Sequence, residues 1–215
     1  MQTNLNSKLT TEQKDIRCPL SPFMRKLKLI SDVTLAFVGT LVFSPLILVI
    51  AIALKIEGRG PLIFKQERIG KGGKPFMLYK FRTMVTNAEA SGPQLCKTED
   101  RRLTPMGSFL RRHHLDEFPQ LWNVIKGDMS FVGPRPERKF FIDQIMELNP
   151  NYALLYEIRP GLFSPATLYN GYTDTMEKML SRLDMDLEYM QHQSFLLDME
   201  IILKTAVAIL TGKKF

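Results

Sequence analysis

The chain has 215 residues, of which 45% are hydrophobic, and this length fits one domain with a substantial core. Its formal net charge of +7 indicates a phosphate-rich partner such as nucleic acid, anionic lipid or a phosphorylated substrate, with a merely solvated basic surface as the alternative. Cys18 and Cys96 lie far apart and have no His or Cys at metal-ligand spacing, which argues against a zinc site and a disulfide framework.

An uncharged stretch runs from Val33 to Leu54 and is long enough to cross the roughly 30 Å hydrocarbon core of a bilayer as a helix. It begins too far from Met1 to be a good signal peptide, so we expect it to be retained. Ser44-Pro45 lies in its middle, where a proline removes a backbone donor and clashes with the preceding turn. The sequence therefore predicts a helix that kinks or breaks at this dipeptide.

The charges that flank this stretch indicate how it lies in the membrane. A spanning helix shows an excess of Lys and Arg on one side, whereas here the basic residues are nearly balanced. They are Arg17, Arg25, Lys26 and Lys28 before the stretch and Lys55, Arg59, Lys65, Arg68 and Lys71 after it. We therefore expect a re-entrant element that turns at Ser44-Pro45 and returns to the cytosolic face. A proline-kinked helix that spans the bilayer is the alternative.

Two alternating runs, PLIFKQERIG at 61–70 and KPFMLYKFRTM at 74–84, flank a glycine-rich turn and predict a β-hairpin. The basic residues of this hairpin could line a phosphate-binding face; they are Lys65, Arg68, Lys80 and Arg82. The next segment, residues 87–105, mixes small, charged and turn-forming residues and predicts a loop with a short helix.

The segment LDEFPQLWNVIKGDMSFVGPRPE at 115–137 predicts a helix that begins near Asp116 and Glu117 and ends before Gly127. Its apolar residues recur at helical spacing: Phe118, Leu121, Trp122 and Ile125. Leu187–Leu210 reads as one further helix, with core packing as its first role and membrane-surface contact as its second. Its apolar face comprises Phe195, Leu196, Met199, Ile202, Leu203 and Ala206. The fold class expected is α+β, mostly helical with a short β-hairpin.

The pair Asp116-Glu117 is the candidate chemical centre. Carboxylates at a helix start lie among backbone N–H groups, where an anion, a phosphate or a metal-phosphate complex can bind. An Asp carboxylate can attack phosphorus, and Mg²⁺ prefers one or two carboxylates together with substrate phosphates. The alternative for an isolated pair is that Asp116 only caps the helix.

Two arginines lie beside prolines downstream of this pair. Gly133-Pro134-Arg135-Pro136 is a stiff segment that can present a planar phosphate ligand, and a plain turn with an exposed arginine is the alternative. Arg159-Pro160-Gly161 repeats the pattern with less force.

Taken together, these segments resemble the monotopic phosphoglycosyl transferases, the bacterial sugar transferases that act on polyprenyl phosphate. The resemblance rests on Ser44-Pro45, on FKQERIGKGGKPFMLYKFRTM at 64–84, on LDEFPQLWNVIKGDMSFVGPRPE at 115–137, on RPGL at 159–162 and on the Asp186/Ser194/Asp198 pattern. It covers about residues 23–211, in the order and spacing of the family.

The resemblance implies a reaction in two steps. Asp116 would attack the β-phosphate of a UDP-sugar, release UMP and keep the phosphosugar, which polyprenyl (undecaprenyl) phosphate would then take. Glu117 would hold Mg²⁺, and Lys80, Arg82 and Arg135 would neutralise phosphates. The resemblance also gives Arg159 and Asp186 a role in shaping or supporting the site.

The resemblance also implies a place for the protein in the cell. Residues 23–54 would form the re-entrant membrane helix, and residues 55–215 a catalytic domain on the cytosolic face of the bacterial inner membrane. Residues 1–22, ahead of the region of resemblance, are expected from their polar composition to form an arm. The reaction would be the first membrane step in making a capsule, an O-antigen, an exopolysaccharide or a glycoprotein glycan. One departure is LFSPATLYNG at 162–171, where the family usually has a Thr-Gly-Trp type stretch, and this leaves the sugar unassigned.

Two other functions stay open at this point. A metal-dependent glycosyltransferase would use Asp184-Met185-Asp186 as an Asp-x-Asp metal site and release UDP instead of UMP. A membrane-anchored scaffold or nucleic-acid-binding protein would use the basic charge alone. Carboxylates interleaved with the basic residues, and the lack of a recognisable nucleic-acid motif, argue against nucleic acid as a partner.

Overall fold

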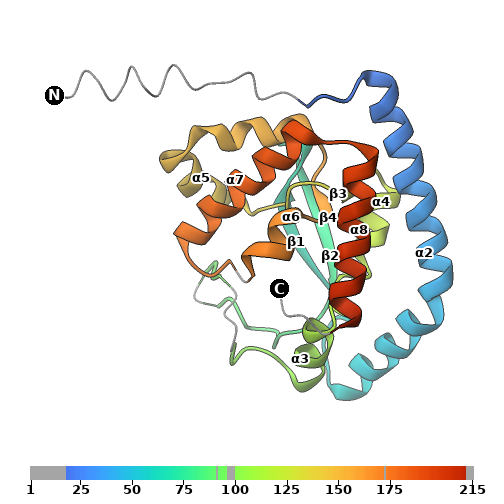
Figure 1. Cartoon of the computed structure of the whole chain (residues 1–215). Coiled ribbons are helices and arrows are strands. Elements are labelled where there is room, and N and C mark those ends of the chain that lie inside the picture. Colours follow the sequence, from blue (N-terminus) through green and yellow to red (C-terminus); the bar gives the residue numbers. More distant parts are fainter. Residues whose placement is uncertain (1–17, 91, 96–99, 172, 212–215) are drawn as a thin grey trace.

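A computed structural model describes residues 18–90, 92–95, 100–171 and 173–211 of the chain (Figure 1). Its helices are α2 (Pro22–Glu57), α3 (Pro105–Arg112), α4 (Gln120–Ile125), α5 (Lys139–Leu148), α6 (Pro165–Asn170), α7 (Met176–His192) and α8 (Phe195–Leu210). Its strands are β1 (Ile63–Ile69), β2 (Pro75–Phe81), β3 (Ser130–Val132) and β4 (Gly161–Phe163). Short 3-10 turns form η1 (Lys71–Gly73), η2 (Leu115–Glu117) and η3 (Pro150–Glu157). The predicted α+β class is confirmed. Most of the polar arm predicted over residues 1–22 lies outside the described residues.

Helix α2 runs without interruption through Ser44-Pro45, so the predicted break is replaced by a bend. Pro45 has no N–H for the carbonyl of Leu41 one turn back, and the Ser44 hydroxyl donates to that carbonyl over 2.8 Å instead. The C-terminal part of the helix, drawn in cyan, runs in a different direction from its N-terminal part (Figure 1). The dipeptide therefore redirects the helix while its freed carbonyl stays satisfied.

Helix α2 is 36 residues long, and it alone among the described helices is long and apolar enough to cross a membrane. It is nevertheless held to the body near both of its ends. Near the start, Lys28 pairs with Asp198 of α8 over 2.5 Å and Asp32 accepts from the Ser130 hydroxyl over 2.7 Å. Near the end, Ile50 and Leu54 are buried in a small cluster with Phe81 and Leu110. Most of its remaining surface is exposed and apolar.

The predicted hairpin is confirmed: β1 and β2 pair antiparallel, with Lys65 opposite Tyr79. A second pair, which the sequence did not predict, joins β3 and β4 in parallel. The backbones approach most closely at Gly161 of β4 and at Gly133, the residue after β3, because an added Cβ at Gly161 would lie 2.1 Å from the nitrogen of Gly133. Only glycine allows this approach, and it brings the Arg159 segment beside the Arg135 segment.

The C-terminal run is two helices, and the prediction of one helix over Leu187–Leu210 is wrong. Helix α7 ends at His192, and Ser194 caps α8 by accepting from the Leu197 N–H over 3.2 Å. The predicted core face is also wrong, because Leu196 and Leu203 are exposed while Ile201 is buried. The register is set by Asp198, whose ion pair with Lys28 turns that side of α8 inward.

The segment at 87–105 forms turns where it is described, and the short helix expected inside it does not occur among these residues, because α3 begins only at Pro105, the last residue of the segment. Helix α3 packs directly on the backbone that follows β2, since a Cβ at Gly107 would lie 1.9 Å from the carbonyl oxygen of Thr83. Glu57, the last residue of α2, accepts from the Thr104 hydroxyl and the Met106 N–H at the start of α3. The end of α2 is thereby joined to the segment that leads to Asp116.

Candidate active site

Asp116 and Glu117 lie on the short turn η2, which runs into α4 through Phe118 and Pro119. This confirms their predicted place at the start of a helix, and Gly127 follows α4 with the positive φ of 80° that suits a helix end. His114 precedes the turn with a φ of 54°, which is uncommon for a residue other than glycine. The chain therefore changes direction sharply just before the two carboxylates.

Glu117 is the point at which two cations converge. Its Oε1 accepts from Lys80 Nζ of β2 over 2.5 Å and from Arg135 Nη2 over 3.1 Å. Burial alone would raise the pKa of Glu117, but Lys80 and Arg135 outweigh it and hold the pKa well below its usual range. Glu117 is therefore ionised at neutral pH, and it balances two positive groups that would otherwise repel each other.

The pKa of Asp116 is shifted in the opposite direction to that of Glu117. It is only 6% exposed, and among the described residues its side chain accepts no hydrogen bond. Burial raises its pKa and the neighbouring Glu117 adds to this, while Lys80 and Arg111 oppose the shift. The result is a weakly solvated carboxylate beside a cationic pair, which is the environment in which a carboxylate is reactive.

Asp186 of α7 stabilises the segment that carries Arg135 by hydrogen bonding to its backbone. Asp186 Oδ2 accepts from the backbone N–H of Arg135 over 3.3 Å, and Oδ1 accepts from the Ser164 hydroxyl over 2.7 Å. Burial raises the pKa of Asp186 to about 6, against the hydrogen bond from Ser164 and the charge of Arg182. Asp186 thus supports the site through the backbone of Arg135, and Asp186 itself is only 2% exposed.

A buried ion-pair group fastens the same segment to the hairpin. Arg68 of β1 donates to the carbonyl of Pro136 and to Glu137, each over 3.1 Å. Arg182 of α7 pairs with the other oxygen of Glu137 over 3.2 Å. Arg68 was a candidate for a phosphate-binding face, and its guanidinium is instead engaged in holding the Arg135 segment in place.

Two further predicted site residues contact α2. Arg82 donates to the carbonyls of Leu54 and Gly58 at the end of α2, over 3.0 and 3.3 Å. Arg159 lies 3.7 Å from Asp32 of the same helix. The structure therefore brings Lys80 and Arg135 to Glu117 and places Asp186 against the backbone of Arg135. Arg82 and Arg159 instead contact α2.

The sequence reading missed His114. Burial lowers its pKa more than Glu117 and Asp116 raise it, and Arg135 and Lys80 lower it further. The imidazole is thus a neutral neighbour of all four charged groups. The signal was its adjacency to Leu115 and Asp116 in a His-His-Leu-Asp-Glu run, but periodicity gives no hint that His114 takes a left-handed conformation.

The carboxylates differ in their fitness to hold a metal ion. No group of three or more metal-ligating side chains occurs within the described residues. Asp184 is exposed, whereas Asp186 is buried and accepts hydrogen bonds from Ser164 and Arg135. The two carboxylates therefore do not form the Asp-x-Asp metal site considered from the sequence. Glu117 uses only Oε1 in its two ion pairs, which leaves Oε2 as a hard oxygen ligand next to Asp116. Such a donor set fits Mg²⁺ that draws its other ligands from a substrate and water.

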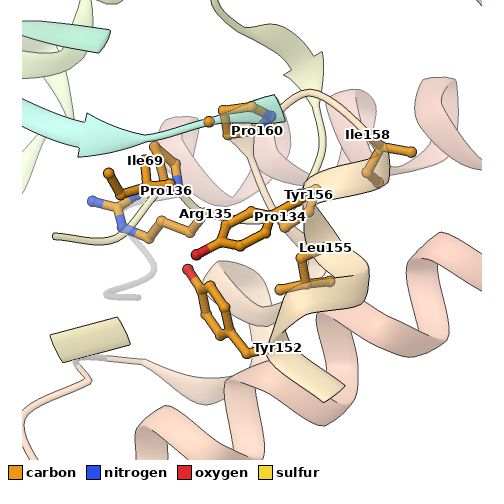
Figure 2. A pocket seen from close by; sticks show the side chains of 10 residues that line it. Ile69, Pro134, Arg135, Pro136, Tyr152, Leu155, Tyr156, Ile158 and Pro160 are labelled. Carbon is orange, nitrogen blue, oxygen red and sulfur yellow. The ribbon is translucent and has the colours of Figure 1, made fainter. Parts of the chain in front are cut away.

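A narrow hollow lies beside Arg135, lined by Tyr152 and Tyr156 of η3 and by Pro134 and Pro160. Figure 2 shows the two tyrosine hydroxyl groups close together and directed toward the Arg135 side chain. The free volume of about 20 Å³ holds a water molecule or two, and a sugar nucleotide does not fit.

An apolar helix and a cluster of cations and carboxylates near its C-terminal half define a membrane-associated protein with a site suited to phosphate groups. The chain belongs to the bacterial sugar transferase family, whose model matches residues 23–212. The resemblance seen in the sequence motifs is thereby confirmed.

Three named relatives show which enzymes and pathways the chain is similar to. The chain is 39% identical over 192 residues to a UDP-N-acetylgalactosamine-undecaprenyl-phosphate N-acetylgalactosaminephosphotransferase of Aeromonas hydrophila, covering 89% of this chain and 45% of the relative. It is 40% identical over 189 residues to a UDP-glucose:undecaprenyl-phosphate glucose-1-phosphate transferase of Escherichia coli strain K12, covering 87% and 41%. It is 39% identical over 196 residues to the exopolysaccharide production protein PSS of Rhizobium leguminosarum bv. phaseoli, covering 88% and 98%. The chain thus spans less than half the length of the first two relatives.

Proposed function

We propose that this protein transfers a sugar-1-phosphate from a UDP-sugar to undecaprenyl phosphate and releases UMP. The observation that carries the proposal is the convergence of Lys80 and Arg135 on Glu117 beside the buried, weakly solvated Asp116. This arrangement offers a nucleophile and two phosphate-binding cations at one point. The names of two relatives, which describe sugar-phosphate transfer to undecaprenyl phosphate, support the same reaction.

In the first step, a carboxylate oxygen of Asp116 attacks the β-phosphorus of the UDP-sugar. The bond from that phosphorus to the bridging oxygen breaks, UMP leaves with the electron pair, and an aspartyl-phosphosugar remains. Lys80 and Arg135 neutralise the phosphate oxygens, whose charge would otherwise repel the attacking carboxylate. Lys80 acts as a compact charge, and Arg135 can hold two oxygens at once.

In the second step, a phosphate oxygen of undecaprenyl phosphate attacks the same phosphorus. The Asp116 carboxylate leaves, which restores the enzyme and gives undecaprenyl-diphospho-sugar. Leu115 and Phe118, on either side of the carboxylates, lie in the apolar cluster with Ile50 and Leu54 of α2. An acceptor whose tail lies in the bilayer therefore has its phosphate close to Asp116.

Mg²⁺ is the metal that this donor set fits, and we propose that Glu117, whose Oε2 is engaged in neither ion pair, would hold it. The ion supplies charge neutralisation at the phosphates when it is bound. Lys80 and Arg135 share that task from the other oxygen of Glu117.

We also propose that α2 is re-entrant, with both ends at the cytosolic face of the inner membrane. A 36-residue helix is about 54 Å long at 1.5 Å per residue, well above the hydrocarbon thickness. The same folded body contacts it near Lys28 and again near Leu54. A helix that spanned the bilayer would carry one of these contacts, with its buried charges, to the opposite side.

The test is release of UMP from a panel of UDP-sugars by the purified protein with Mg²⁺ and undecaprenyl phosphate. We expect UMP from at least one sugar and a loss of more than about 1000-fold in Asp116→Asn, since the nucleophile is removed. The release of UDP in place of UMP would show glycosyl transfer and would overturn the proposal.

A further inference from the structure

Asn123 of α4 is a buried polar residue, 0% exposed, to which none of the roles above has been assigned. Its side-chain amide faces the hairpin. Oδ1 accepts from the backbone N–H of Tyr79 over 3.1 Å, and Nδ2 donates to the backbone carbonyl of Met77 over 2.6 Å. Both bonds reach the same strand, two residues apart, and both go to backbone atoms.

Those backbone atoms lie on the outer edge of the hairpin. The β1–β2 sheet has two strands, so β2 pairs with β1 on one side only. An exposed edge presents a row of N–H and C=O groups that need partners. The amide of Asn123 offers one donor and one acceptor with the spacing that a third strand would offer. It therefore locks α4 to β2 in one register.

This register decides where Lys80 lies relative to Glu117. Lys80 follows Tyr79 directly on β2, while Glu117 is on the turn that leads into α4. The other edge of the hairpin holds the Arg135 segment, where the N–H of Ile69 donates to the carbonyl of Glu137 over 3.0 Å. The two edges of the hairpin thus contact the two elements that carry Glu117 and Arg135. Among the described residues, Asn123 makes every hydrogen bond between α4 and β2.

We propose that Asn123 is a positioning residue, whose amide bridge to Met77 and Tyr79 places Lys80 at Glu117. The bridge is what sets the 2.5 Å distance between Lys80 Nζ and Glu117 Oε1. A shift of about 1 Å in such a charge pair is enough to lower turnover by about 100-fold. The kinetic consequence rests on the proposed function, but the geometric consequence does not.

The experiment compares Asn123→Ala with Val124→Ala, a neighbour on α4 that is equally buried and makes no bond to β2. Both variants lose core packing, and only the first loses the bridge. UMP release is measured first, and the rate at which an amine-reactive reagent acylates Lys80 is measured second. Both measurements are made well below the melting temperature of each variant. The exposed Lys139 serves as the internal reference for labelling.

Asn123→Ala should lose about 10- to 100-fold in turnover and should acylate Lys80 several-fold faster than the wild type, because the ion pair is loosened. Val124→Ala should match the wild type in both. Equal Lys80 labelling in wild type and Asn123→Ala would overturn the proposal. If Asn123→Ala does not fold, Asn123→Asp keeps the acceptor for Tyr79 and loses the donor, and faster Lys80 labelling is expected there too. A wild type that releases no UMP would refute the proposed reaction and leave the labelling test intact.

Discussion

Asp186 shows how one residue links the stability of this protein to pH. Its pKa in the folded protein is about 6, above the ordinary value of 3.8, because it is buried. The folded state therefore binds this proton more tightly than the unfolded state does. The resulting stabilisation is fully present below pH 3.8 and is lost as the pH rises through about 6.

Asp186→Asn removes this pH dependence and keeps an oxygen for Ser164 or Arg135. We expect the free energy of unfolding of the wild type, measured relative to the variant, to fall by on the order of 3 kcal/mol between pH 4 and pH 7. The measurement is the melting temperature of both proteins in detergent across this range. Parallel curves would show that the Asp186 carboxyl titrates at its ordinary pKa.

Arg82 gives a second test at the residue scale, because its place in the structure differs from its predicted role. It is 7% exposed and donates to two carbonyls at the end of α2. Arg82→Ala should lower the free energy of unfolding by about 2–4 kcal/mol, since buried carbonyls lose charge-assisted bonds. Lys80→Ala, the matched control, should lower turnover and leave the melting temperature nearly unchanged. Lost turnover at an unchanged melting temperature in Arg82→Ala would support a phosphate contact instead.

At the scale of elements, the junction of α3 with β2 depends on Gly107. Gly107→Ala places a Cβ 1.9 Å from the Thr83 oxygen, so the helix must move away from the strand end. We expect a loss of about 3 kcal/mol or more in stability, at the upper end of the usual cost of overpacking, because the contact is with rigid backbone. Gly58→Ala is the control, because that position is extended and has nothing within 4 Å. Similar melting temperatures for the two variants would contradict this packing.

Local sequence patterns predicted the elements whose signals are local. The alternating runs around Gly72 predicted the hairpin, and Asp116-Glu117 before an apolar period predicted the helix start. The patterns failed where contacts between residues far apart in the sequence determine which face of an element is buried or which strands pair. The apolar residues of α8 gave no hint that Asp198 would face inward, because its partner Lys28 is 170 residues away. The β3–β4 pair likewise depends on two short strands that only Gly133 and Gly161 allow to approach.

The same contrast between local signals and distant contacts explains why only part of the site was predicted. Lys80 and Arg135 were predicted as neighbours of the Asp116-Glu117 pair, and both contact Glu117. Their positions follow from local structure, since Lys80 lies on a hairpin strand and Arg135 lies between two prolines. Arg82 and Arg159 carry the same chemistry but lie next to α2, and a long apolar helix in the sequence does not reveal which cations attach it. His114 has no periodic signal at all.

For the whole molecule, the central question is how α2 lies in the membrane. Single cysteines at the exposed positions Lys26 and Arg59, in a background without Cys18 and Cys96, report on its two ends. With a membrane-impermeant maleimide, we expect both to be protected in intact spheroplasts and both to react in inverted vesicles. Opposite behaviour of the two positions would establish a spanning helix and contradict the re-entrant proposal.

The most direct test of the mechanism is to trap the phosphosugar on the protein. With a UDP-sugar labelled at the β-phosphate, Mg²⁺ and no undecaprenyl phosphate, the label should remain on the wild-type chain, in a peptide that contains Asp116. Addition of undecaprenyl phosphate should transfer it to lipid, and Asp116→Asn should acquire no label. A wild type that converts the substrate with no label on the chain, or an Asp116→Asn variant that still turns over, would contradict the account.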